Sequence, residues 1–177
     1  MSKSKFSLRQ IIGDAFLIIA GALTLGLMAL PYLVVKTGYD FGIIQTSDTS
    51  RGSCYDLITN GQDLNSDALA ASRVFLILVL VAACIVILLG LVDMIGSFMG
   101  KKALNVTFIS RLVSILLVAF AAAAFICIVV CVSESGFGDT SGFDIFQIGT
   151  GYIMALVFSL VALLASFVAQ TKKAKKK

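Results

Sequence analysis

Three ionisable residues stand inside, or at the edge of, long apolar segments, where a charged side chain is costly. Asp14 lies near the start of the first apolar run, Asp93 near the end of the second, and Arg111 directly before the third. An unpaired charge at bilayer depth costs about 2.5–3.5 kcal/mol on insertion scales. We therefore expect Asp14, Asp93 and Arg111 to form one intramembrane polar cluster, with Arg111 as the counter-ion and Ser110 and Ser114 nearby.

Such a cluster fits two roles. Intramembrane acids titrate in transporters, so Asp14 and Asp93 would serve as a proton or cation relay. A charge cluster can also fix which helices are neighbours. Transporter sites usually lie near the bilayer midplane, where helices are interrupted. Here the middle of each run is aliphatic, and the one proline, Pro31, falls near the outer end of the first run. We favour the structural role and keep the relay as the alternative.

The four cysteines divide into two pairs. Cys84 and Cys127 fall within apolar runs and are predicted to be small core residues. Cys54 falls in the longer outer loop, residues 36–73, and Cys131 falls near the outer end of the third apolar run. A disulfide between Cys54 and Cys131 is therefore allowed by topology, although it also requires close alpha carbons.

Sequence motifs that are typical of catalysis or of a bound cofactor are missing. The sequence has no histidine and no cysteine pair at zinc-site spacing. It also has no phosphate-binding glycine loop and no Gly-x-Ser-x-Gly nucleophile motif. Its lysine-rich carboxyl end is explained by membrane topology and anionic headgroups rather than by nucleic acid. We expect a protein that is not an enzyme and uses no metal, cofactor, nucleic acid or identified small-molecule substrate.

Asp14, Asp93 and Arg111 are positioned by the long apolar runs in or beside which they lie. The chain has 177 residues, of which 59% are hydrophobic and 14% are charged. Soluble domains are roughly 45–50% apolar and about 25% charged, so a single water-soluble globule is excluded. Each of four runs exceeds the roughly 20 residues that a helix needs to cross a bilayer. We expect a single-domain all-α membrane protein, a four-helix transmembrane bundle. The predicted spans are residues 11–35, 74–99, 112–133 and 148–170.

The basic residues predict the orientation of these spans. Eleven of the fourteen lysines and arginines fall in the amino tail 1–10, the loop 100–111 or the carboxyl tail 171–177, whereas the loops 36–73 and 134–147 carry most of the acids. Because basic residues near span ends are retained in the cytoplasm, both termini should be cytoplasmic and both acidic loops outside, with the cell membrane as the expected location. The first apolar run is longer than the 7–15 residues of a secretory signal, so we expect it to be retained.

The longer outer loop is the expected contact surface for a partner. Tyr39, Phe41 and Ile43 alternate with smaller or polar residues, a period of two that predicts a strand, and residues 54–58 are predicted to form another. A small antiparallel sheet above the bundle follows. Tyr55, together with the three alternating residues, is the candidate partner surface.

Small residues recur along the predicted helices at four-residue spacing, as at Ala155 and Ser159. Such residues let helix backbones approach closely in lipid. A tightly packed bundle explains them, and self-association into a homo-oligomer is the alternative.

Five short segments stand at the ends of the predicted loops and spans: Cys54-Tyr55-Asp56-Leu57, Asp63-Leu64, Ala70-Ala71-Ser72-Arg73, Ser110-Arg111-Leu112-Val113 and Gly149-Thr150-Gly151-Tyr152. In order and spacing they resemble the corresponding segments of claudin-type tetraspan membrane proteins. The resemblance lies in layout, because this chain has no tryptophan and only one cysteine in the longer outer loop. It implies a left-handed bundle capped by an outer sheet.

The sequence is therefore consistent with two functions. The first is a non-enzymatic tetraspan protein that contacts other membrane proteins or copies of itself, as a structural, assembly or auxiliary subunit. The second is a small transporter or channel component that uses Asp14 and Asp93.

Overall fold

The structure, a computed structural model, describes residues 8–35, 51–60, 67–99, 104–134 and 146–168. Within these ranges the elements are α1 (Leu8–Leu27), β1 (Pro31–Val35), β2 (Arg51–Ser53), α2 (Cys54–Asn60), α3 (Asp67–Phe98), α4 (Leu104–Glu134), β3 (Phe146–Ile148) and α6 (Thr150–Val168).

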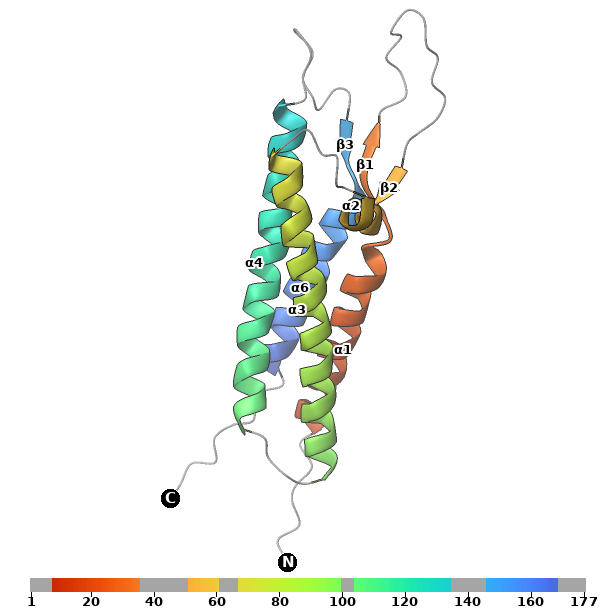
Figure 1. Cartoon of the computed structure of the whole chain (residues 1–177). Helices are drawn as coiled ribbons and strands as arrows, with labels where there is room; N and C mark the ends of the chain where they lie inside the picture. Colours follow the sequence, from red (N-terminus) through yellow and green to blue (C-terminus); the bar gives the residue numbers. More distant parts are fainter. Residues whose placement is uncertain (1–7, 36–50, 61–66, 100–103, 135–145, 169–177) are drawn as a thin grey trace, which may run out of the picture.

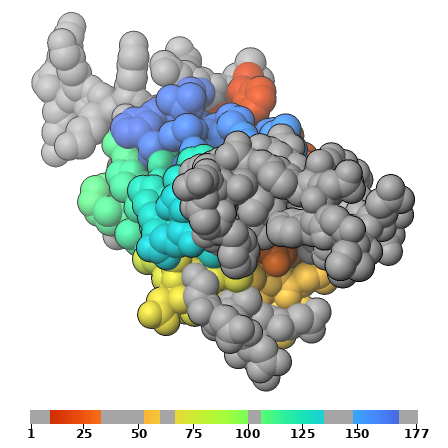
Figure 2. Space-filling model, turned by 90° about the horizontal axis from the view of Figure 1, so that it is seen from above, coloured from red at the N-terminus to blue at the C-terminus, as the bar shows by residue number. Residues whose placement is uncertain are grey.

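Four of the described helices, α1, α3, α4 and α6, are long and apolar enough to cross a membrane. Helix α1 packs on α3 and α6, and α4 packs on the same two helices, so the order around the bundle is α1, α3, α4, α6. Seen from above, α6, α4 and α3 follow one another around the molecule (Figure 2). The predicted four-helix membrane bundle is confirmed, and the chain is a multi-pass membrane protein.

The bundle has two different ends (Figure 1). Helix α1 begins and α6 finishes at one of them, which we call the termini end. The three strands and the short helix α2 lie at the opposite end, and we call these four elements together the cap.

The first span is shorter than the sequence predicted. Helix α1 stops at Leu27, and three successive backbone bonds of the i to i+3 type tighten the chain as far as Leu30. Pro31 follows, and it cannot continue a helix because it has no backbone N–H. Residues 31–35, predicted as the end of the span, form strand β1 instead.

Helices α3 and α4 are longer than predicted. They contain 32 and 31 residues, so each is about 47 Å long, well beyond a hydrocarbon core of about 30 Å. Helix α3 begins at Asp67, an acid in the first turn, where it stabilises the positive end of the helix dipole. The extra turns of α3, residues 67–73, stand beside the cap, whereas those of α4, residues 104–111, lie at the termini end. Helix α3 contacts α2, and α4 contacts β3.

The cap contains the expected antiparallel sheet, built from other segments than predicted. In the described chain its strand order is β2-β1-β3, and β3 comes from the second outer loop. Residues 54–58, predicted as a strand, belong to helix α2. The helix is favoured by its amino end, where Ser53 and Asp56 exchange hydrogen bonds in the reciprocal pattern of a capping box. The strand predicted at 39–43 lies outside the described residues.

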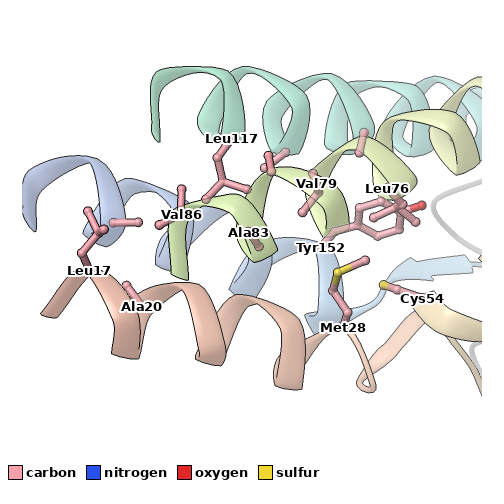
Figure 3. Close-up of a cluster of buried hydrophobic side chains, with 14 of the residues drawn as sticks. Leu17, Ala20, Met28, Cys54, Leu76, Val79, Ala83, Val86, Leu117 and Tyr152 are labelled. Carbon is pink, nitrogen blue, oxygen red and sulfur yellow. The ribbon is translucent and has the colours of Figure 1, made fainter. Parts of the chain in front are cut away.

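One apolar core runs from the bundle into the cap (Figure 3). It begins near the termini end with Leu17, continues through Val86 and Val79, and reaches Met28 and Cys54 at the base of the cap. Cap and bundle therefore share one set of buried apolar side chains.

Candidate functional site

The carboxylate of Asp93 is the centre of a hydrogen-bonded cluster at the termini end. Its side chain is 4% exposed. One oxygen accepts a hydrogen bond from Nε2 of Gln10 at 3.3 Å, and the other accepts one from Oγ1 of Thr107 at 3.0 Å. These bonds join α3 to α1 and to α4, both of which are its neighbours in the bundle.

Asp14 lies within electrostatic range of Asp93, as predicted from their similar depth. It is 2% exposed, and its Oδ2 atom is buried without a hydrogen-bond partner among the described residues. The close approach of α1 and α3 depends on Gly90, because a Cβ atom there would lie 2.8 Å from Cγ1 of Ile18 and 3.5 Å from the Asp14 carbonyl oxygen. Glycine at position 90 thus brings the two acids together.

Arg111 is not the counter-ion that the sequence predicted. Its guanidinium carbon lies 4.3 Å from the centre of the Phe167 ring on α6, a cation–π contact. No ion pair joins it to Asp14 or Asp93 in the described part of the chain, and its Nε and Nη2 atoms are buried without hydrogen-bond partners. Helix α4, which carries Arg111, lies diagonally across the bundle from α1, which carries Asp14, and Thr107 already donates to Oδ2 of Asp93.

Sequence reasoning missed three members of this region: Gln10, Thr107 and Phe167. Two of them could have been predicted from the spacing of the sequence, because Gln10 precedes Asp14 by four residues and Thr107 precedes Arg111 by four. Residues four apart share a helix face. Phe167 carried no such signal, since its contact depends on how α4 and α6 are rotated.

The other residues predicted near the cluster lie at this level of the bundle and are buried. Ser110 is 6% exposed, and Ser114 is fully buried. The Ser114 hydroxyl donates to the Ser110 carbonyl oxygen at 2.8 Å, a bond within α4. The Ser114 hydroxyl therefore bonds to its own helix rather than to a carboxylate.

The arrangement of these side chains is compatible with two roles. The bonds around Asp93 hold three helices in register, which is a structural task. The unpartnered Oδ2 atom of Asp14, beside a second carboxylate, is an acceptor that a proton or a cation could occupy.

The cap forms a second candidate site, and hydrogen bonds fasten it to the bundle. The Tyr55 hydroxyl donates to the Leu25 carbonyl oxygen at 2.6 Å. Nε of Arg73 on α3 donates to the Ile58 carbonyl oxygen at 2.9 Å. The Cys54 amide donates to the Leu30 carbonyl oxygen at 3.3 Å. Helix α2 is thus tied to α1 at one end and to α3 at the other.

The residues at the start of α6 also contact the cap. The Gly149 amide donates to the Tyr32 carbonyl oxygen at 2.8 Å. A Cβ atom at Gly149 would stand 1.9 Å from the Pro31 carbonyl oxygen, and one at Gly151 would stand 2.8 Å from Sγ of Cys54. Only glycine fits at these two positions without displacing the strand or α2.

The cysteines depart from the sequence predictions. Cys54 and Cys131 are separate thiols, so the disulfide considered for them is not formed in this structure. Burial raises the pKa of the Cys54 thiol to about 12. Cys84, predicted as a core residue, is exposed on the outer surface of the bundle, and Cys127 is half-buried.

Of the four residues predicted as a partner surface, one is described. Tyr55 is half-buried and its hydroxyl is used for the bond to Leu25, so it holds the cap in place. Tyr39, Phe41 and Ile43 lie outside the described residues.

Within the five described ranges, no three acidic or cysteine residues gather where they could hold a metal ion. No protein-family model, no curated protein and no solved structure matches the chain. The resemblance to claudin-type proteins stays a prediction.

Proposed function

We propose that this protein is a non-enzymatic tetraspan membrane protein that acts by contacting other proteins, as a structural, assembly or auxiliary subunit. The observation that carries the proposal is the fixed attachment of the cap. Its bonds from Tyr55 and Arg73, together with the buried Cys54, give α2 and the sheet a set position on the bundle.

A fixed cap is a suitable base for recognition. Binding residues are often carried on loops that a rigid scaffold positions, and a pre-ordered scaffold lowers the entropy lost on binding. In the sequence, residues 36–50 connect β1 to β2, and residues 135–145 connect α4 to β3. Both connections start and end at the cap or beside it. The alternating Tyr39, Phe41 and Ile43 belong to the first of them.

The proposal includes an orientation. The basic residues beside the spans favour a cytoplasmic termini end and an outer cap, which places the contact surface at the cell surface. Contacts to other membrane proteins, or to further copies of the chain, would then form outside or within the bilayer. The resemblance in layout to claudin-type proteins supports the same orientation.

A transporter or channel component is the second candidate, and one observation favours it. Asp14 and Asp93 are both buried, within electrostatic range of each other, and Oδ2 of Asp14 has no hydrogen-bond partner in the part of the chain that the structure describes. A group of this kind could exchange a proton or a cation. The bonds of Asp93 to Gln10 and Thr107 favour the structural role instead.

Purification in mild detergent separates the two functions. The proposal expects defined polymers or a stoichiometric protein partner. A monomer or small oligomer that conducts ions after reconstitution into liposomes would favour the second candidate.

A matched pair of variants connects this experiment to the cap. Tyr55→Phe removes the hydroxyl that bonds Leu25, whereas Tyr32→Phe removes a hydroxyl that makes no hydrogen bond in the described chain. We expect Tyr55→Phe to reduce recovery of the complex about fivefold, corresponding to about 1 kcal/mol, and Tyr32→Phe to leave it near the wild-type level.

A further inference from the structure

Asp14 and Asp93 lie on the sides of α1 and α3 that face each other. Gln10 and Asp14 are four residues apart and so share one face of α1. Gln10 donates to Asp93, and the Asp14 carbonyl oxygen lies beside Gly90, about one turn before Asp93 on α3. The two carboxyl groups are therefore about one helical turn apart along the bundle, and they interact electrostatically.

The charges of the two acids are supported unequally. Each oxygen of the Asp93 carboxylate accepts one hydrogen bond, from Gln10 or from Thr107. Asp14 is almost fully buried, and its Oδ2 atom has no hydrogen-bond partner among the described residues. A buried carboxylate that has neither a hydrogen bond nor a counter-charge is strongly destabilising. The Asp14 carboxylate therefore requires one positive charge close to Oδ2.

No basic side chain that the structure describes supplies this charge. Arg73 donates to the Ile58 carbonyl oxygen at the cap, far along the bundle from Asp14. Arg111 lies against the Phe167 ring on the α6 side of α4. Among the described residues, the charge beside Asp14 is therefore left for a bound ion.

The atoms around Asp14 and Asp93 suit a small monovalent metal ion. Both acids offer carboxylate oxygens, and Oγ1 of Thr107 keeps its lone pairs while it donates to Asp93. Oxygen ligands select hard cations. A divalent site usually gathers more carboxylates, and no three acidic or cysteine residues meet in the described ranges. A proton on Oδ2 would create a buried donor that needs an acceptor in turn, whereas a metal ion uses the oxygen lone pairs directly.

We propose that Asp14 and Asp93 together bind one sodium ion, which fastens α1 to α3 at the termini end of the bundle. The ion is a fixed part of the bundle. The site therefore requires no transport and does not depend on what the cap contacts, so it goes beyond both functions considered above.

The test is thermal unfolding of the purified full-length protein in detergent, with sodium chloride or choline chloride at equal ionic strength. We expect sodium to raise the melting temperature of wild type by about 3 °C, because a ligand that binds the folded state stabilises it. Asp14→Asn should melt at the same temperature in both salts. In choline chloride it should be at least as stable as wild type, since it removes a like charge beside Asp93.

Asp56→Asn is the matched control, because it makes the same acid-to-amide change in α2 of the cap. We expect it to keep the full response to sodium. An equal response of wild type and Asp14→Asn, or no response of wild type, would overturn the proposal.

A second measurement needs only the wild-type protein. Binding of radioactive sodium to the purified protein is measured by equilibrium dialysis, with unlabelled sodium chloride or choline chloride as the competitor. We expect saturation at one ion per chain and competition by sodium alone. Absence of saturable binding, together with stability that responds to pH but not to sodium, would show that a proton neutralises the pair and would overturn the proposal. Either result leaves the contact role of the cap untouched, because that role is tested by recovery of a partner.

Discussion

The hydroxyl oxygens of Ser72 and Tyr152 lie 2.5 Å apart in the buried core, joining α3 to α6 across the centre of the bundle. The Ser72 hydroxyl also donates to the Ala124 carbonyl oxygen of α4, at 3.3 Å. Because serine has one hydroxyl hydrogen, Tyr152 must be the donor to Ser72. Three helices therefore meet at one hydrogen-bonded point just below the cap.

This donor order predicts unequal costs of removing either hydroxyl. Tyr152→Phe leaves Ser72 its bond to Ala124 and should cost about 0.6 kcal/mol, the mean for bonds within membrane bundles. Ser72→Ala leaves the buried Tyr152 hydroxyl with no acceptor and should cost about 1–3 kcal/mol. Reversible unfolding of both variants in detergent measures the difference. A larger cost for Tyr152→Phe would show that the donor order is reversed.

The junction between β1 and α6 predicts a steep penalty at one glycine. Gly149→Ala puts a Cβ atom 1.9 Å from the Pro31 carbonyl oxygen, so the strand must move, at about 3 kcal/mol or more. Gly26→Ala is the control, because a Cβ there meets nothing within 4 Å and alanine favours helix. Thermal unfolding should show a large loss for the first variant and none for the second. Equal melting temperatures would contradict the tight junction.

The amino end of α2 predicts a pH dependence. Hydrogen bonds from the side chain and backbone of Ser53 hold the pKa of Asp56 below its ordinary value of 3.8. A carboxyl whose pKa is lowered by folding stabilises the fold above its unfolded pKa, and loses that effect as the pH falls through the folded pKa. Wild type should therefore lose more stability than Asp56→Asn between pH 5 and more acidic solution. Parallel losses, measured by thermal unfolding across this range, would rule the capping contribution out.

The two buried acids predict opposite responses to amide substitution. Asp93→Asn disturbs the bonds from Gln10 and Thr107, so abundance should fall and stability should drop by about 1–3 kcal/mol. Asp14→Asn removes a like charge beside Asp93 and leaves stability unchanged or higher. Expression level and detergent unfolding test both. Normal assembly of Asp93→Asn together with lost ion flux would support the relay instead.

The four spans were predictable because long apolar runs have one main explanation in a chain with this little charge. The end of α1 was not, since Tyr-Leu-Val-Val after Pro31 is as apolar as a helix and equally suited to a strand. Residues 54–58, which belong to helix α2, were wrongly predicted as a strand for a related reason. Five residues are too few for periodicity to distinguish a helix from a strand. The spacing of Ser53 and Asp56, typical of a capping box, was the usable signal.

The polar cluster was predictable in part. Depth alone placed Asp14 near Asp93, because both lie near the same end of antiparallel helices. Depth could not show which neighbour Arg111 meets, since that depends on the rotation of α4 and on the order of helices around the bundle. The result is a contact with Phe167 rather than with either acid.

We propose that the cap contacts another protein while the bundle serves as its support. The most direct measurement is photocrosslinking in native membranes, with a photoreactive residue at Thr59 on the exposed side of α2 and, as the control, at Phe108 near the opposite end of the bundle. We expect one discrete protein adduct from Thr59 and none from Phe108. Absence of any protein adduct from Thr59, together with ion conduction by the purified monomer in liposomes, would contradict a contact role for the cap.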